Sequence, residues 1–155
     1  MEYRIDIIQE KHHSDIIALS RTLFNKEEAF HKGDEIGNGF VILFQEKVIA
    51  YLTFALIEFD IPHFIVMSLG VSESHQNKKL ASLLLQECKK YFSHYYTYLH
   101  QRYNVEKKIY LQVRTQNQKA IRVYQREEFV YFETLSNYYK NPQEDAFHMV
   151  YIFSS

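Results

Sequence analysis

The most informative segment of this chain is Ile109-Tyr-Leu-Gln-Val-Arg-Thr-Gln-Asn-Gln-Lys-Ala-Ile-Arg-Val-Tyr124. Apolar residues dominate its first part, which predicts a buried strand. Asn117 is of a residue type that caps helices. Ala120, Ile121 and Tyr124 then fall on one face of the short helix that would follow. The segment therefore predicts a strand that leads directly into a capped helix.

The chain on both sides of this segment continues the alternation of strands and helices. Clusters of β-branched and aromatic residues predict strands at residues 3–8, 40–44, 48–59, 63–71, 109–114, 129–133 and 146–153. Ser14 is predicted to cap a first helix, and a long second helix has its apolar stripe at Leu80, Leu83, Leu84, Cys88, Tyr91, Phe92 and Tyr95. We expect a mobile loop at residues 25–39 and an excursion at residues 137–145 between the last two strands. This order predicts an α/β layer with a mixed sheet.

Length and composition indicate a single compact domain that spans residues 1–155. Hydrophobic residues make up 46% of the chain, with 13 tyrosines and 12 phenylalanines, so a packed core is expected without disulfides. The net charge of −1 gives no electrostatic reason to expect nucleic acid as a partner.

Cysteine and histidine usage argues against several kinds of site. Cys88 is the only cysteine, so neither a disulfide framework nor a cysteine zinc site can form, and a reducing compartment is favoured. The histidines show no metal-ligand spacing, so no metal is expected. The N-terminus lacks the pattern of a signal peptide, and no apolar run approaches the roughly 18 residues of a membrane span. The sequence therefore predicts a soluble, cytoplasmic protein without a membrane partner.

The order of strand, capped helix, Tyr124, Phe129 and then Asn137-Tyr138-Tyr139 resembles the C-terminal half of a GNAT-type acyl-CoA N-acyltransferase. Within that superfamily, Asn137-Tyr138-Tyr139-Lys140 followed by Asp145-Ala146 and Met149 is most similar to the protein N-terminal acetyltransferases. The resemblance covers about residues 40–153. It implies the GNAT fold, in which a mixed central sheet with flanking helices has a splayed strand pair, and acetyl-CoA lies in the splay.

The resemblance also implies where acetyl-CoA binds. In GNAT proteins, a loop of pattern Gln/Arg-x-x-Gly-x-Gly/Ala holds the pyrophosphate on backbone amides at a helix N-terminus, where N–H groups and the helix dipole favour an anion. The matching run is Gln76-Asn77-Lys78-Lys79-Leu80-Ala81, in which Lys79 replaces the central glycine. Leu69, Gly70 and Val71 would line the acetyl and pantetheine arm, and Asn117 would contact that arm besides capping its helix.

Lys79 leaves two outcomes open. If its position needs a positive φ, a side chain there costs about 1 kcal/mol and weakens binding of CoA. Alternatively, Lys78 and Lys79 supply positive charge to the phosphates and offset the strain. A third interpretation is that Gln76 to Lys79 is only a solvated helix start.

Tyr124 matches the tyrosine that faces the CoA sulfur in many GNAT enzymes and serves as a general acid. A phenol with a pKa of about 10 does not fully protonate a thiolate whose acid has a pKa of about 8.5, but it can hydrogen-bond to the thiolate and transfer its proton late. The alternative is a core tyrosine without a catalytic role. The glycine that usually precedes Phe129 is Glu128 in this chain.

The sequence leaves the general base open. Position 112 commonly carries His or Glu in N-terminal acetyltransferases, whereas Gln112 can only orient a water because an amide does not accept a proton. His75 lies where a relative has a catalytic tyrosine, and an imidazole suits a base near neutral pH. It can equally be an exposed loop histidine. Glu27 and Glu28 in the loop are further candidates.

The resemblance assigns an acceptor site as well. Tyr138 and Tyr139 would clamp the backbone of the substrate, although paired tyrosines on a hairpin also pack across strands. The loop at residues 24–31, which begins with Phe24 and contains Glu27 and Glu28, would form the opposite wall.

These features predict an acetyl-CoA-dependent N-acetyltransferase that transfers acetyl directly, in a ternary complex, to the α-amino group of a peptide or protein. An α-amino group, with a pKa of about 8, is easier to deprotonate than a lysine with a pKa of about 10.4. One alternative is the same fold acting on a small-molecule amine. Another is a non-catalytic acyl-CoA-binding or interaction module, suggested by Lys79, Gln112 and Glu128. Whether an auxiliary subunit takes part stays open.

Overall fold

A computed structural model describes residues 2–58, 61–100 and 107–154 of the chain. One seven-stranded sheet forms its centre, in the order β1-β2-β3-β4-β5-β7-β6. Every neighbouring pair is antiparallel except β4 and β5, which are parallel, so the predicted mixed sheet is confirmed. The strands are β1 (Arg4–Ile7), β2 (Asn38–Phe44), β3 (Lys47–Ile57), β4 (His63–Val71), β5 (Lys108–Arg114), β6 (Val130–Lys140) and β7 (Gln143–Ile152), and the helices are α1 (His13–Leu23), α2 (Leu80–His100) and α3 (Gln118–Arg126), with short 3-10 turns at Glu10–His12 and Glu73–His75.

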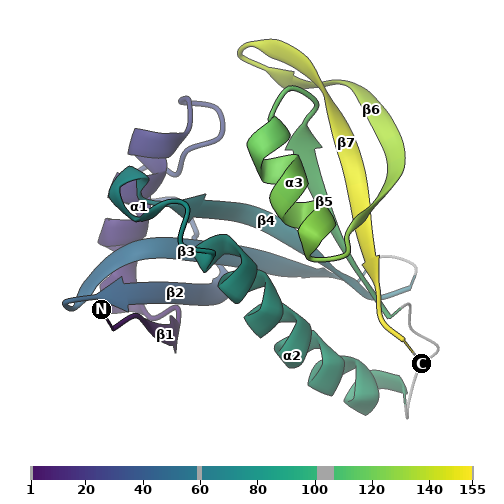
Figure 1. The fold of residues 1–155 in the computed structure, drawn as a ribbon, viewed down its shortest axis with the longest axis horizontal. Helices are drawn as coiled ribbons and strands as arrows, with labels where there is room; N and C mark the ends of the chain where they lie inside the picture. The colour runs from purple at the N-terminus through teal and green to yellow at the C-terminus, as the bar shows by residue number, and fades with distance from the viewer. Residues whose placement is uncertain (1, 59–60, 101–106, 155) are drawn as a thin grey trace.

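The sheet opens between β4 and β5. These strands pair only through Phe64 with Ile109 and Ile65 with Tyr110, and they separate beyond that point. In Figure 1 the two halves of the sheet fan apart, and α3 and the start of α2 lie beside the opening. The splayed strand pair that the sequence predicted is therefore present, and it determines where a ligand can enter the sheet.

Helices cover both faces of the first half of the sheet. Successive side chains of a strand point to opposite faces, so β2 sends Ile42 into the core under α2 and Val41 into the core under α1. Ile16 of α1 is fully buried in the second of these cores. Phe92 of α2 stacks on Phe64 of β4 with ring centroids 3.8 Å apart. Figure 1 shows α2 in front of the sheet and α1 behind it.

The strands predicted at residues 40–44 and 48–59 pair as a hairpin of β2 and β3. Its two turn residues, Gln45 and Glu46, both have positive φ, at 51° and 62°. Two successive left-handed residues are typical of the tight turn that matches the twist of antiparallel strands. β4 covers the predicted residues 63–71, whereas β3 ends at Ile57, and Phe59 of its predicted span lies outside the described residues.

The predicted cap of α1 and part of the predicted apolar stripe of α2 need correction. Ser14 does not cap α1, because a 3-10 turn precedes the helix and places His12 at the N-cap. On α2, Leu83 is 37% exposed and lies off the buried stripe, whereas Tyr91 is 44% exposed but its ring packs against Phe54 with centroids 5.3 Å apart. Tyr96 is buried instead, because its hydroxyl accepts the amide of Phe64 and donates to the carbonyl of Lys108. The buried stripe is Leu80, Leu84, Leu85, Cys88, Phe92, Tyr96 and Leu99.

The segment at residues 137–145 is not an excursion. β6 runs to Lys140 and β7 starts at Gln143, so only Asn141 and Pro142 turn the chain. The pairing of β6 with β7 is irregular between Leu135 and Tyr139. Almost every residue of β6 is exposed, so the sequence carries no alternation that would have revealed its length.

None of the helices within residues 2–58, 61–100 and 107–154 is long and apolar enough to cross a membrane. Within the same part of the chain, no group of histidine, cysteine and acidic side chains could hold a metal ion.

Candidate active site

A cavity of about 680 Å³ lies where the sheet opens. It is lined by β4, the loop before α2, the first turn of α2, and α3. Leu23 and Phe24 from the end of α1 also line it, so it receives residues from both faces of the sheet. Among the predicted cofactor-binding residues, Lys78 alone is not part of the lining, which contains Leu69, Gly70, Val71, Gln76, Asn77, Lys79, Leu80, Ala81, Asn117 and Tyr124.

The loop before α2 is shaped for an anion. Asn77 and Lys79 have positive φ, at 64° and 62°, and Lys79 thus has the conformation that the sequence analysis considered for the glycine position. The amides of Leu80, Ala81 and Ser82 have no partner within the helix, because the first N–H groups of an α-helix are never bonded inside it. Together with the helix dipole they favour a phosphate group here.

Ser82 was not predicted from the sequence. It lines the same cavity, and its hydroxyl is buried without a hydrogen-bond partner among the described residues. Such a group is rare in native structures unless a ligand or water completes it. Its position three residues after Lys79, on the first turn of α2, was the available signal.

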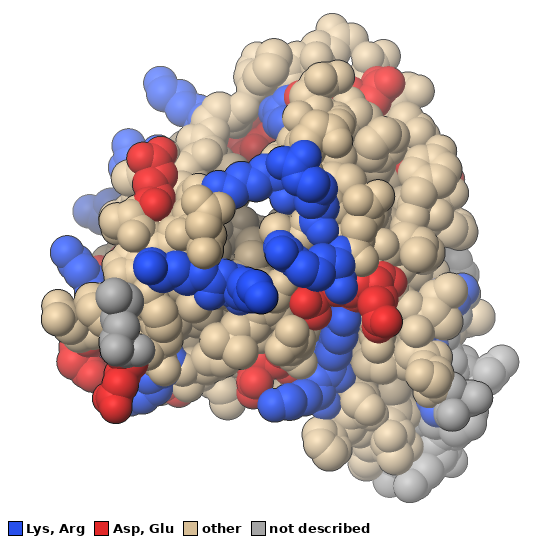
Figure 2. Space-filling view, in the orientation of Figure 1, with Lys and Arg blue, Asp and Glu red and all other residues tan. Residues whose placement is uncertain are grey.

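Positive side chains surround the mouth of the cavity. Figure 2 shows them gathered round a hollow, over the start of α2 and over α3. Those that line the cavity are Lys79 from the loop and Lys119, Arg122 and Arg126 from α3. The three residues of α3 follow an i, i+3, i+7 spacing, which places them on one face of a helix. This spacing is visible in the sequence, but these three residues were not among the predicted site residues.

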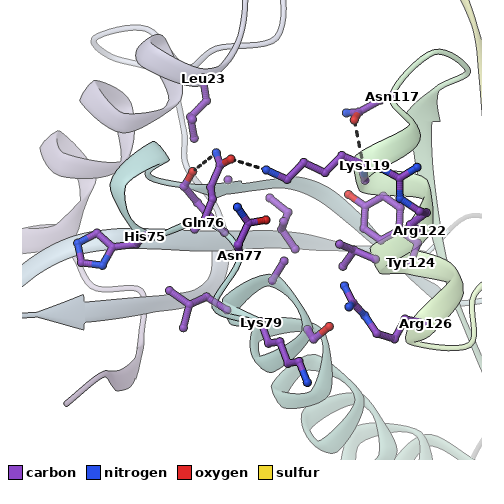
Figure 3. Close-up of a pocket in the computed structure, with 18 of the residues that line it drawn as sticks. Leu23, His75, Gln76, Asn77, Lys79, Asn117, Lys119, Arg122, Tyr124 and Arg126 are labelled. Atoms are coloured by element: carbon purple, nitrogen blue, oxygen red, sulfur yellow. Dashed lines mark hydrogen bonds between the residues drawn. The ribbon is translucent and has the colours of Figure 1, made fainter. Parts of the chain in front are cut away.

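Gln76 ties the loop before α2 to β4 on one side and to α3 on the other. Its side-chain amide donates to the carbonyl of Val71 at 3.1 Å, and its oxygen accepts the Lys119 ammonium at 2.6 Å (Figure 3). Asn117 caps α3, as predicted, by accepting the Ala120 amide at 3.2 Å. Both side chains therefore hold the walls of the cavity in place.

Tyr124 lies on α3 with only 8% of its surface exposed. Burial raises the pKa of Tyr124 to about 12, and the nearby Tyr51 adds to the rise. A full proton transfer to a thiolate whose acid has a pKa of about 8.5 would therefore cost about 5 kcal/mol. The neutral phenol can instead donate a hydrogen bond to an anion without losing its proton.

Arg114, at the end of β5, links that strand to the loop after α1 and to β7. Its guanidinium donates to Glu28 at 2.6 Å and to Glu144 at 3.1 Å. It also lies 4.2 Å from the centre of the Tyr139 ring. Burial raises the pKa of the Tyr139 phenol, and Glu28, Tyr138 and Tyr124 contribute in the same direction. Tyr139 and Tyr124 are thus close enough to influence each other.

The loop that the sequence analysis expected to be mobile is tied to the hairpin of β6 and β7. The Glu27 carboxylate accepts the amides of Lys140 and Asn141, at 3.2 and 2.8 Å. The Asn25 side chain donates to the carbonyl of Asn141. We call the contacts of Asn25, Glu27 and Glu28 with Arg114, Lys140 and Asn141 the loop–hairpin bridge.

The candidate bases are not gathered at Tyr124. The His75 ring lies at the edge of the cavity, bonded at 3.0 Å to the Tyr3 hydroxyl, and points away from Tyr124 in Figure 3. Gln112 lies outside the cavity lining, because its neighbours Leu111 and Val113 fill the core under the helices. Its register partner on β7 is His148. Glu27 and Glu28 are engaged in the bridge.

Comparison with known proteins shows which family has this architecture. A model described as the Acetyltransferase (GNAT) family matches residues 5–129. The chain belongs to the GNAT acetyltransferase family. It is therefore an acyltransferase, and acetyl-CoA is its co-substrate. The match starts earlier than the resemblance at residues 40–153 and stops at Phe129, so Tyr138 and Tyr139 lie beyond it.

Solved structures share the GNAT fold over nearly the whole chain. Arabidopsis thaliana NAA60 in complex with acetyl-CoA has 19% identity and a TM-score of 0.77, over 98% of this chain and 100% of that one. Arabidopsis thaliana Naa50 in complex with the bisubstrate analogue CoA-Ac-MVNAL has 20% identity and a TM-score of 0.72, over 99% of this chain and 100% of that one. The ribosomal-protein-S18-alanine N-acetyltransferase from Escherichia coli has 18% identity and a TM-score of 0.73, over 99% of this chain and 97% of that one. At these identities the likeness establishes the fold. No curated protein matches the sequence.

Proposed function

We propose that this GNAT acetyltransferase transfers acetyl from acetyl-CoA directly to the α-amino group of a peptide or protein, in a ternary complex. The loop–hairpin bridge is the observation that carries the proposal. It joins the loop after α1 to the end of β5 and to the turn between β6 and β7, through residues that do not line the cavity where CoA would bind. We place the acceptor amine on this side of Tyr124, next to Phe24 and Tyr139.

The chemistry of the bridge suits a chain terminus. Glu28 and Glu144 outnumber the single Arg114 cation between them, so the site attracts a positively charged ammonium group. Tyr138 is 47% exposed and packs edge-on against Tyr139 at 5.0 Å, which leaves ring faces and hydroxyls for a peptide backbone. At pH 7 the neutral fraction of an α-amine exceeds that of a lysine about two hundredfold. A strong base is therefore unnecessary for this acceptor.

The co-substrate would occupy the cavity as follows. The amides of Leu80 and Ala81, with the Ser82 hydroxyl, would hold the diphosphate. The amine nitrogen would bond to the carbonyl carbon, the C–S bond would break, and the amine would release one proton to water. Tyr124 would donate a hydrogen bond to the departing thiolate. The pantetheine arm would run along Leu69, Gly70, Val71 and Asn117. Lys78 does not line the cavity and has no role in this proposed mode of CoA binding.

A panel of three acceptors tests the proposal. It contains peptides with a free N-terminus, the same peptides with a blocked N-terminus and a free lysine, and a polyamine. Release of CoA and the mass of each product are measured with purified protein. We expect acetylation of the free α-amine alone. Comparable transfer to the blocked peptide or the polyamine would reject the N-terminal assignment.

Tyr138→Ala supplies a second arm of the test. Because Tyr138 is half exposed, its removal should leave the fold intact and raise KM for peptides about tenfold, the effect of losing one aromatic contact. The Kd for acetyl-CoA should not change. An unchanged peptide KM would remove Tyr138 from the acceptor site.

A further inference from the structure

Arg122 and Arg126 line the cavity one helical turn apart on α3. Residues four positions apart lie on the same helix face with about 5–6 Å between their Cβ atoms. Neither guanidinium has an ion pair or a side-chain hydrogen bond within the described residues. The Lys119 ammonium, by contrast, is bound to Gln76.

This pair of charges is left without compensation. Two like charges at i and i+4 repel each other and disfavour the helix. Glu127, the nearest carboxylate in the sequence, is engaged by the Lys89 ammonium at 3.4 Å and by the Gln86 amide at 3.3 Å. The two guanidinium groups therefore face the cavity with no internal partner, which indicates a site for an anion (Figure 3).

In the function proposed above, the diphosphate of the co-substrate is held at the start of α2 by backbone amides and the Ser82 hydroxyl. Acetyl-CoA carries one more phosphate, a monoester on the 3′ carbon of its ribose. A phosphate monoester is a dianion near neutral pH, and guanidinium groups bind it through paired N–H donors. Two unpaired arginines on one helix face match that group in charge and in number of donors.

We infer that Arg122 and Arg126 form the binding site for the ribose 3′-phosphate of acetyl-CoA and make the enzyme select the 3′-phosphorylated coenzyme over its dephospho form. The site concerns the co-substrate alone. It therefore holds whichever amine is the acceptor.

Calorimetric titration with CoA and with 3′-dephospho-CoA tests this site without any acceptor. We expect the wild-type protein to bind CoA at least thirtyfold more tightly than dephospho-CoA. In the Arg122→Gln/Arg126→Gln variant the affinity for CoA should fall and that for dephospho-CoA should stay, so that the ratio drops below about threefold. Arg21→Gln, on the exposed surface of α1, should keep the wild-type ratio.

Several results would overturn the inference. These are equal wild-type affinities, failure of the wild type to bind CoA, a preserved ratio in the double variant, or an equal loss for both ligands, which would indicate a diffuse electrostatic effect. Arg122→Lys and Arg126→Lys guard against misfolding, because they keep the charge and lose only the paired donors. Each should retain part of the preference, and retention of all of it would also count against the site.

Discussion

Lys79 and Glu128 show that side chains can occupy backbone positions suited to glycine. They are the two places where the family pattern has glycine, and their φ angles are 62° and 70°. The sequence therefore predicted the site of the strain at Lys79, and the structure shows that the loop keeps its turn. Two of the three departures that suggested a non-catalytic module, Lys79 and Glu128, thus have the positive φ that glycine favours.

Glu128→Gly should raise the free energy of unfolding by about 0.5–1 kcal/mol, because glycine adopts positive φ without a steric cost. Urea unfolding followed by circular dichroism measures the change. Glu128→Ala is the matched control, since it keeps a Cβ atom and should show no comparable gain. Equal stability of the two variants would mean that φ at this position is not strained.

Tyr124 was predicted from the resemblance to GNAT enzymes, but its environment was not predicted. Its high pKa depends on burial and on Tyr51, which lies 73 positions earlier in the sequence. Tyr124→Phe should lower kcat about a hundredfold, the effect of removing one hydrogen-bond donor to a developing anion, with Kd for acetyl-CoA within threefold. Steady-state kinetics and calorimetry provide these values. Tyr91→Phe is the control, because Tyr91 is half-exposed on α2 and does not line the cavity, so its kcat should not change. An unaffected kcat in Tyr124→Phe would end the assignment of Tyr124.

At the scale of elements, the sequence predicted those strands and turns that depend on contacts between residues close in the chain. β4 and the turn between β2 and β3 follow from residues that are neighbours in sequence. The loop–hairpin bridge could not be predicted, because Glu28 meets Arg114 across 86 positions and Glu27 meets Lys140 across 113. A charged, weakly apolar segment reads as a mobile loop until those distant partners are known.

Glu28→Ala should loosen the bridge. The Glu28 and Arg114 side chains are only 23% and 15% exposed, so losing the pair should cost about 1–3 kcal/mol locally. Hydrogen exchange should accelerate at residues 25–31 and in the β6–β7 turn, and peptide KM should rise while Kd for acetyl-CoA stays. Glu46→Ala is the control, because its pair with Arg4 is exposed and should contribute little. Unchanged exchange in Glu28→Ala would show that the loop is held by other contacts.

The whole molecule distributes its charge unevenly. A net charge of −1 suggested no electrostatic preference, yet four cations converge on one cavity mouth. Net charge is a sum over the surface and is silent on where the charges meet, which depends on the fold. The same holds for the phenols, since thirteen tyrosines in the sequence gave no indication of which ones are buried beside one another.

Buried phenols make the stability of the whole fold sensitive to alkaline pH. Burial raises the pKa of both Tyr51 and Tyr124 to about 12, whereas an unfolded tyrosine titrates near pH 10. Above pH 10 the unfolded chain therefore holds fewer protons than the folded one, and the free energy of unfolding falls as pH rises toward 12. Each residue should account for up to about 2–3 kcal/mol of that loss. Urea unfolding at pH 8, 10 and 11 should show a shallower decline for Tyr51→Phe than for the wild type, and parallel declines would mean that Tyr51 ionises equally in both states.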